Sequence, residues 1–326
     1  METITDSLLK RISHAFFGYG LAARKNYSFG DRMVGFLVCA RPVFMLLTPF
    51  NAASAAVLAL GGYPIWSQCL LGFCAAAFAA GAINTFNNYV DRERDKHIWQ
   101  ARPIPSGRIK PWNALLMATV FLAASLIITW FFFNLPTFFI LLLALILGSL
   151  YSSYLRDKVG YLSLPPIVGL IYLGGWAAFS PETLFSSFLP WYLYILGVVW
   201  QAAHIMIGYP LHITSDTGNK GAIKIPPAFF FTPSPRSAVW MGIGFTCLTM
   251  LLSALMPLLA PLGTLYLVLI IAAGIYALYT GLRLLKDALN RESGLKAFAS
   301  LTIFRLVISA AILLSILLYQ IEGTVR

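Results

Sequence analysis

Apolar stretches recur along the whole chain, and short polar segments separate them. Each is close to the roughly 20 residues that cross a bilayer as an α-helix. They cover residues 40–61, 66–90, 112–133, 136–155, 162–180, 188–212, 237–256, 260–282 and 298–319. The third and fourth stretches, and the seventh and eighth, are separated only by the turns NLPT and APLG. The pattern predicts an all-α, polytopic membrane protein with nine transmembrane helices.

Composition supports this prediction. Hydrophobic residues make up 59% of the 326 residues and charged residues 11%, whereas a soluble domain carries about 25% charged residues. No polar linker divides the chain, which predicts one domain over residues 1–326. The stretch SLLKRISHAFFGYGLAARK has no continuous apolar core typical of a cleavable signal. We therefore expect residues 1–35 to contain an amphipathic segment on the cytoplasmic membrane surface.

The basic residues indicate an orientation. With nine spans, one side of the membrane holds residues 1–40, 91–111, 156–161, 213–236 and 283–297, and nearly all 23 Lys and Arg residues lie there or beside it. Because Lys and Arg mark cytoplasmic loops, we expect a multi-pass integral membrane protein with these loops in the cytoplasm (in the cell inner membrane, if the source is bacterial). The net charge of +11 is attributed to topology, membrane lipid and a polyanionic substrate, with no nucleic-acid partner.

Amide and carboxylate side chains gather where the second span ends, in GAINTFNNYVDRERD. Spacings of three and four residues place Asn84, Asn87, Asn88, Asp91 and Asp95 along one predicted helix face. Polar groups at a membrane boundary usually line a water-filled cavity. Carboxylate oxygens together with substrate phosphates are what Mg²⁺ prefers. The stripe predicts a central cavity that opens to the cytoplasm and holds Mg²⁺.

The motif RPIPSG follows this stripe. Its two prolines stop the helix and its Ser-Gly closes a turn, so we expect Arg102 to fold back over the cavity and contact phosphate. The alternative is a solvated helix end with local charge pairs, which explains Arg92, Glu93 and Arg94 well and Asn87 and Asp91 poorly.

The pattern N-[DN]-x-x-D-x-x-x-D followed by R-P-[IL]-P-S-G resembles the UbiA superfamily of intramembrane prenyltransferases. The stretch DRERD…RPIPSGRI is most similar to the branch of the chlorophyll and bacteriochlorophyll synthases. The resemblance implies nine transmembrane helices and transfer of an isoprenoid from its diphosphate to an acceptor. It also implies that Mg²⁺ is held by two Asp-rich motifs.

The second Asp-rich motif of that family is matched by GYPLHITSDTGNKGAIKIPP. Asp216 fits its second acid, and Lys220 and Lys224 can reach phosphate. His212 stands where the family usually has the first acid. This histidine can be a general base, a weak metal ligand, or a neutral hydrogen-bonding residue in a variant without activity.

The resemblance implies a metal set of Asn87, Asp91, Asp95 and Asp216. Asn88 replaces an acid of the first motif, as His212 does in the second, and both replacements remove a negative charge. We therefore expect a second Mg²⁺ to bind more weakly, or only with substrate.

Further basic and aromatic residues resemble the family's diphosphate contacts. Arg41 precedes a proline at the start of the first span, and YSSYLRDK offers Tyr151, Arg156 and Lys158. The alternative role for Arg41, and for Tyr154 in the YSSYLRDK stretch, is an anchor at the membrane interface. His204 is expected to hydrogen-bond within the bundle. Arg305 has no predicted role because it can snorkel to the interface.

The expected function is prenyl transfer from an isoprenyl diphosphate to an aromatic or hydroxyl-bearing lipophilic acceptor, with Mg²⁺-assisted ionisation. One alternative is a terpene cyclase of the same superfamily, in which the substrate's own double bonds capture the cation. The other is a non-catalytic membrane protein that binds lipid or carries solutes.

Overall fold

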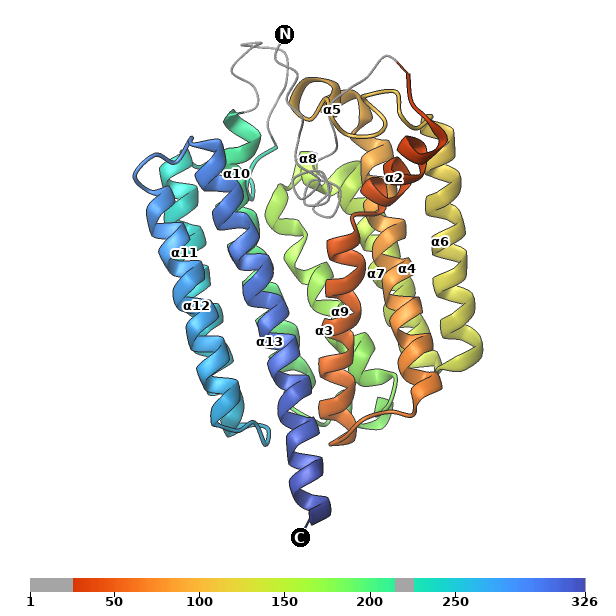
Figure 1. Ribbon diagram of the computed structural model, residues 1–326, viewed down its shortest axis with the longest axis vertical. Helices are drawn as coiled ribbons and strands as arrows, with labels where there is room; N and C mark the ends of the chain where they lie inside the picture. The colour runs from red at the N-terminus through yellow and green to blue at the C-terminus, as the bar shows by residue number, and fades with distance from the viewer. Residues whose placement is uncertain (1–25, 215–225, 326) are drawn as a thin grey trace.

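The computed structural model describes residues 26–214 and 226–325, and this part of the chain forms a helical bundle (Figure 1). Eight helical segments in it are long and apolar enough to cross a membrane. They contain α3 (Pro42–Leu60), α4 (Trp66–Val90), α6 (Pro111–Phe132), α7 (Leu135–Leu150) with its extension to Lys158, α10 (Leu189–Thr214), α11 (Pro235–Leu255), α12 (Thr264–Leu284) and α13 (Arg291–Val325). The chain is therefore a multi-pass integral membrane protein.

The predicted count of nine spans is not confirmed, because the stretch 162–180 forms a shorter element. Its helix α9 has 13 residues, Pro165–Ala177, which is about 20 Å at 1.5 Å per residue against a hydrocarbon core of about 30 Å. A 3₁₀ turn, η2 (Tyr161–Ser163), precedes it. Another, η3 (Pro181–Thr183), follows after a short turn. The prolines that open α9 and η3 explain why the apolar stretch is not one helix.

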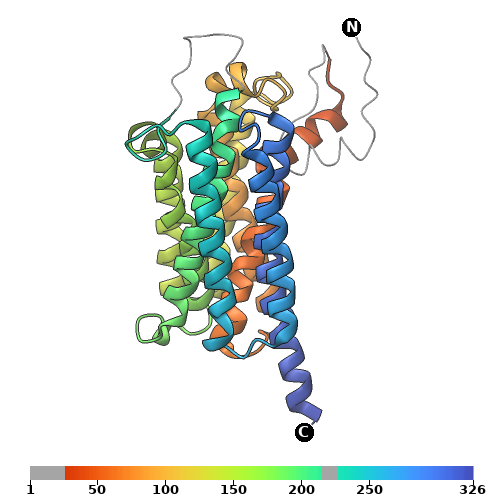
Figure 2. The ribbon, with the colours of Figure 1, turned by 90° about the vertical axis from the view of Figure 1, so that its left-hand side faces the viewer.

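Short helices cover one end of the bundle, where Figure 1 shows α2 (Phe29–Ala40) and α5 (Arg92–Ile98) at the top. Helix α2 starts with a capping box formed by Ser28 and Asp31. Arg41 joins α2 to α3 with a left-handed backbone, φ 53°. Figure 2 shows the long helices running along the bundle axis, and α13 extends past them at the opposite end. We refer to the upper end as the α5 end.

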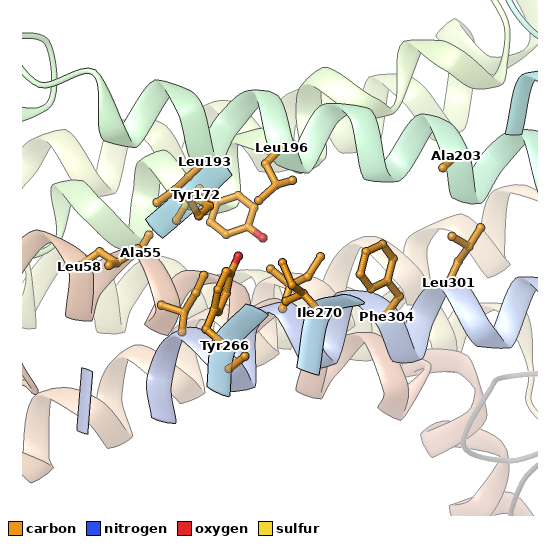
Figure 3. Close-up of a cluster of buried hydrophobic side chains, with 14 of the residues drawn as sticks. Ala55, Leu58, Tyr172, Leu193, Leu196, Ala203, Tyr266, Ile270, Leu301 and Phe304 are labelled. Carbon is orange, nitrogen blue, oxygen red and sulfur yellow. The ribbon is translucent and has the colours of Figure 1, made fainter. Parts of the chain in front are cut away.

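The main hydrophobic core lies among α3, α9, α10, α11, α12 and α13. Leu196 of α10, Ile270 of α12 and Phe304 of α13 are fully buried there (Figure 3). Gly175 of α9 lies against the backbone carbonyl of Ala52 in α3, where a Cβ atom would collide. Helices α9 and α3 can therefore pack closely.

A cavity of about 1040 Å³ lies inside the bundle. Its walls come mainly from α3, α4, α7, α9 and α10, and most lining residues are apolar. The cavity reaches from Asp95 at the α5 end to Tyr63, in the turn that joins α3 to α4. This volume is at the upper limit of ordinary small-molecule sites, about 300–1000 Å³.

Candidate active site

Charged and amide side chains surround the cavity where it meets α5. We call this group the arginine–carboxylate cradle. It comprises Asn87, Asp91, Asp95, Arg41, Arg94, Arg102 and Arg156, all of which line the cavity. The stripe predicted from α4 into α5 and the loop after it thus meets a second segment that is more than 50 positions away in the sequence.

Asp91 lies between α4 and α5 and is clamped by Arg156. Nη2 of Arg156 lies 2.6 Å from Oδ1 of Asp91, and its Nη1 donates to Oδ2 at 2.8 Å. Arg94 approaches Oδ1 at 3.5 Å and also pairs with Asp157 at 2.9 Å. Both Asp91 and Arg156 are buried, so this bidentate pair is shielded from water.

Asp95 pairs with Arg102, whose Nη1 donates to Oδ2 at 2.7 Å. The RPIPSG turn produces this contact, since Ser106 N bonds to Arg102 O and Ile109 N to Pro103 O. Arg102 therefore folds back to the cavity, as the sequence predicts. Burial raises the pKa of the Asp95 carboxyl, and the positive charge of Arg102 opposes that rise.

The Asn87 amide lies between Asp91 and Ser152. In the orientation that satisfies both ends of the amide, Nδ2 donates to Asp91 Oδ2 at 3.3 Å, and Oδ1 accepts from Arg156 Nη1 at 3.2 Å and from Ser152 Oγ at 3.3 Å. Arg41 lines the same part of the cavity. Burial lowers the pKa of the Arg41 guanidinium to about 10, so the group stays charged at neutral pH.

A π-helix, η1 (Tyr151–Leu155), follows α7 and leads into α8 (Arg156–Lys158). Such bulges often occur at functional sites. This one places Tyr151 and Ser152 on the cavity wall with Arg156. Lys158 is exposed and does not line the cavity. The exposed position of Lys158 in α8 does not support the predicted phosphate contact, which stays a prediction.

Tyr154 is 53% exposed, which fits the alternative reading as an interfacial anchor.

Asn88 does not share the face of Asn87 and Asp91, which corrects the predicted stripe. Its Nδ2 donates to Cys39 O at 3.0 Å and to Asn84 O at 2.9 Å, and it does not line the cavity. The amide fastens α4 to α2. The replacement of an acid at this position therefore removes no cavity ligand here.

The second motif is only partly visible. His212 lies at the end of α10, lines the cavity and stacks on Tyr161 with ring centroids 5.0 Å apart. Asp216, Lys220 and Lys224 lie outside the described residues. Their roles remain predictions.

A second polar group lines the cavity farther from α5, and no catalytic or binding role was predicted for it. We call it the deep polar wall: Asn51 of α3 with Gln201 and His204 of α10. All three are at least nine-tenths buried. Arg305 lies behind them, fully buried, so it does not snorkel.

Three contacts hold the deep polar wall. Asn51 Oδ1 accepts from Arg305 Nε at 3.0 Å and from Ser309 Oγ at 2.8 Å. His204 Nε2 bonds to Thr302 Oγ at 3.1 Å, which confirms the expected hydrogen bond within the bundle. An asparagine and an arginine inside apolar spans were the available signal, but sequence cannot show that they meet.

These features define a class of protein, namely multi-pass membrane bundles with acidic and basic side chains at one end of a largely apolar cavity. The profile of the UbiA prenyltransferase family matches residues 46–308. This match covers most of the chain, which therefore belongs to the UbiA prenyltransferase family.

Relatives agree with this assignment. Protoheme IX farnesyltransferase of Stenotrophomonas maltophilia (strain R551-3) is 30% identical over 180 residues, which cover 50% of this chain and 58% of that protein. Digeranylgeranylglyceryl phosphate synthase of Methanospirillum hungatei JF-1 is 28% identical over 285 residues, with coverages of 83% and 96%. The chain spans about half the length of some curated relatives, 58% and 43% in two farnesyltransferases.

A solved structure of a UbiA homologue from Archaeoglobus fulgidus, bound to DMAPP and Mg²⁺, shares the fold. Its TM-score is 0.55 at 19% identity, with 86% of this chain and 99% of that chain covered.

The cradle suits Mg²⁺ only together with a phosphate-bearing ligand. Within residues 26–214 and 226–325, no three His, Cys, Asp or Glu residues are grouped so that they could hold a metal. Asn87, Asp91 and Asp95 supply the hard oxygen atoms that Mg²⁺ accepts, and this ion is commonly held by one or two carboxylates plus substrate phosphates. These residues therefore fit a metal that phosphate helps to bind.

Proposed function

We propose that the protein is an intramembrane prenyltransferase that moves an isoprenoid from its diphosphate to a lipophilic acceptor. One observation carries this proposal: the Asp91–Arg156 pair and the Asp95–Arg102 pair meet at one end of a long apolar cavity. A diphosphate needs the charged end and an isoprenoid chain needs the apolar part. The basic loops are proposed to lie on the cytoplasmic side.

The guanidinium groups of the cradle would bind the diphosphate. Arg41, Arg102 and Arg156 line one region, and planar guanidinium groups bind phosphate oxygens in a bidentate manner. Lys220 and Lys224 are proposed to add further positive charge. With diphosphate bound, Arg156 and Arg102 can exchange a carboxylate partner for a phosphate partner.

That exchange would free the oxygen atoms of Asp91 and Asp95 to hold Mg²⁺, together with Asn87 and Asp216. Bound Mg²⁺ supplies positive charge that stabilises the departing diphosphate. The proposal does not need Asn88, because its amide is used between helices.

Transfer then follows from charge separation in a dry cavity. The bond between the first isoprenoid carbon and the diphosphate oxygen breaks, and its electron pair leaves with the diphosphate. The cradle cations stabilise that negative charge as it develops. An acceptor electron pair then bonds to the allylic carbon, and the acceptor loses a proton.

The relatives suggest two kinds of acceptor for this chain, a haem and a prenylated glyceryl phosphate, since their names specify those chemistries. The cavity volume of about 1040 Å³ leaves room for an acceptor beside an isoprenoid chain. This favours a transferase over a cyclase, which needs no second substrate.

The test is incubation of the purified full-length protein with farnesyl or geranylgeranyl diphosphate and Mg²⁺. Pyrophosphate release that requires both Mg²⁺ and an added acceptor supports a transferase. A cyclic hydrocarbon from the donor alone would show a terpene cyclase. Absence of release with either acceptor type, in a preparation that binds neither donor, would favour a non-catalytic lipid-binding protein.

The product would be identified by mass spectrometry of lipids from cells with and without the gene. A prenylated compound that disappears with the gene reveals the acceptor.

A further inference from the structure

Hydrogen bonds with neighbouring residues determine the tautomer of His204 and the amide orientation of Asn51, two buried side chains of the deep polar wall. Thr302 Oγ donates to Phe298 O at 3.2 Å, so it accepts from the Nε2–H of His204. The proton on Nε2 makes Nδ1 the ring nitrogen with the free electron pair. His204 lines the cavity, and Nδ1 has no partner among the described residues.

Asn51 is fixed in the complementary sense. Its Oδ1 is taken by two donors, Arg305 Nε and Ser309 Oγ, so the Nδ2 donor is left for the cavity that Asn51 lines. The wall therefore offers one donor from α3 and one acceptor from α10. Both residues are at most 3% exposed, and a buried hydrogen-bonding group without a partner is costly.

Aromatic rings hold this arrangement rigid. The Arg305 guanidinium lies between the rings of Tyr172 and Trp200, 4.7 Å from each centroid. Trp200 stacks on His204 at 4.9 Å. Trp200 itself is fixed by a bond from Nε1 to Leu301 O at 2.9 Å. The column carries a positive charge, and none of the described acidic residues pairs with Arg305.

The position of the wall separates it from the cradle. Asn51 of α3 follows Arg41, the residue before that helix, by ten positions, and His204 precedes His212 by eight positions on α10. At 1.5 Å per residue these intervals are about 15 Å and about 12 Å along the bundle. A diphosphate in the cradle cannot also satisfy the wall, and an isoprenoid chain has no hydrogen-bonding group to offer it.

From this geometry we propose that the deep polar wall is a recognition subsite for the acceptor. His204 Nδ1 accepts a hydrogen bond from one polar group of the acceptor, such as a hydroxyl, and Asn51 Nδ2 donates to a second polar group about 10 Å away, the distance between Thr302 and Ser309 on α13, while the reacting atom points toward the cradle. Trp200, Phe298 and Phe44 line the cavity around His204 and provide flat apolar surfaces for a ring that carries this group. The subsite rests on the proposed function, because it assigns the second substrate of that reaction.

The probe for the test is 1-naphthol, with naphthalene as the analogue that lacks the hydroxyl. Full-length protein in lipid nanodiscs is first saturated with Mg²⁺ and farnesyl S-thiolodiphosphate, a slowly ionising donor analogue that fills the cradle. Binding of each probe is then measured relative to its partition into empty nanodiscs. The wild type is expected to prefer 1-naphthol by roughly tenfold, the range of one or two hydrogen bonds.

Two variants test the named atoms. His204→Phe keeps a ring in the column and removes Nδ1. Asn51→Asp keeps the oxygen that Arg305 needs and replaces the donor by an acceptor. His204→Phe is expected to reduce the preference to within about twofold of unity, and Asn51→Asp to reduce it less, because the single hydroxyl of 1-naphthol reaches one of the two atoms. The matched control is His97→Phe, the same change at an exposed position of α5, which should keep the preference.

Binding of the donor analogue in every preparation separates this proposal from the proposed function. Loss of the 1-naphthol preference with intact donor binding supports the subsite. No preference in the wild type, or a full preference in both variants, overturns it even when donor binding is normal. If His204→Phe does not fold, Thr302→Val replaces it. Thr302→Val removes the contact that orients the His204 imidazole. An unchanged preference for 1-naphthol in both Thr302→Val and Asn51→Asp would likewise overturn the proposal.

Discussion

The cradle and the deep polar wall hold positive charge in different ways. In the cradle, Arg156 and Arg102 are paired with the carboxylates of Asp91 and Asp95. In the deep polar wall, Arg305 is held by two aromatic rings and the Asn51 amide. The cradle has ion pairs that a substrate can exchange, and the deep polar wall has a buried cation that contacts two rings and one amide.

This difference in how the arginines are held matches the ligands proposed for the cradle and for the deep polar wall. A guanidinium that is paired with a carboxylate can transfer its hydrogen bonds to a phosphate. A carboxylate is planar and a phosphate is tetrahedral, but both present anionic oxygen atoms that accept from the same N–H donors. The Arg305 guanidinium donates to the Asn51 amide through Nε, while its Nη1 and Nη2 have no hydrogen-bond partner among the described residues, and its charge polarises the donor on Asn51. The cradle is therefore suited to a charged substrate that arrives and leaves, and the wall to a neutral hydrogen-bonding group.

The largest expected effect is at Asp91. Asp91→Ala should reduce pyrophosphate release by about 10²–10³-fold, the range for losing one stabilising group at a developing charge. Asp91→Asn keeps the side-chain size and should also be impaired, which separates the lost charge from a cavity beside buried Arg156. The control is Glu93→Gln, an exposed carboxylate on the same short helix. Release within tenfold of wild type in Asp91→Ala would refute metal-assisted ionisation at this residue.

The second-largest effect is expected at Arg156, and Lys158 serves as the comparison. Arg156→Gln should weaken binding of the donor analogue by about 10–100-fold, because a buried charge-assisted contact to phosphate contributes about 1.5–3 kcal/mol. Lys158→Gln makes a similar charge change two residues away at an exposed position, and its binding should be almost unchanged. Equal losses in both variants, measured by calorimetry, would show that only the local positive field matters.

A smaller effect concerns the order of binding. Because Asp91 and Asp95 are already neutralised by arginines, Mg²⁺ alone should bind weakly. Adding methylenediphosphonate should tighten its binding, by a factor within the usual 5–150-fold range of coupling between sites. Calorimetric titration with Mg²⁺ in the presence and absence of the diphosphonate measures this coupling. An identical Mg²⁺ affinity in both titrations would exclude the exchange of partners.

The smallest effect on the metal is expected at Asn88. Asn88→Asp restores the acid typical of the family motif, yet it should change the Mg²⁺ affinity with diphosphonate by less than about twofold, because the side chain at position 88 does not line the cavity, whereas a contact worth about 1 kcal/mol would change the affinity about fivefold. The new carboxylate would face the Cys39 and Asn84 carbonyls, so thermal unfolding should occur at lower temperature. Asn113→Asp, at an exposed position, is the control. A clear gain in Mg²⁺ affinity would mean that residue 88 reaches the site.

The sequence was informative where neighbouring positions determine geometry. Asp91 and Asp95 are one helical turn apart, and the prolines of RPIPSG force a return of the chain that brings Arg102 to Asp95. Local spacing does not decide which edge of a stripe faces a cavity, however, and so Asn88 was misplaced. Lys158 is exposed and follows a π-helix that the sequence pattern did not predict.

Contacts between distant segments were beyond sequence reasoning. Asn51 and Arg305 are 254 positions apart, and each alone is an isolated polar residue in an apolar span. The short helix α9 is a similar case. Its apolar residues continue past the helix ends, so hydropathy alone predicted a longer span, while the prolines and 3₁₀ turns shorten it.

The most direct measurement compares binding at the cradle and at the deep polar wall in the same preparations. The wild type, Arg156→Gln and His204→Phe are each titrated with farnesyl S-thiolodiphosphate and Mg²⁺, and separately with 1-naphthol and naphthalene. We predict that Arg156→Gln loses donor binding and keeps the preference for 1-naphthol, and that His204→Phe does the reverse. If both variants lose both properties, or neither variant loses either, the assignment of the donor to the cradle and of the acceptor to the deep polar wall is contradicted.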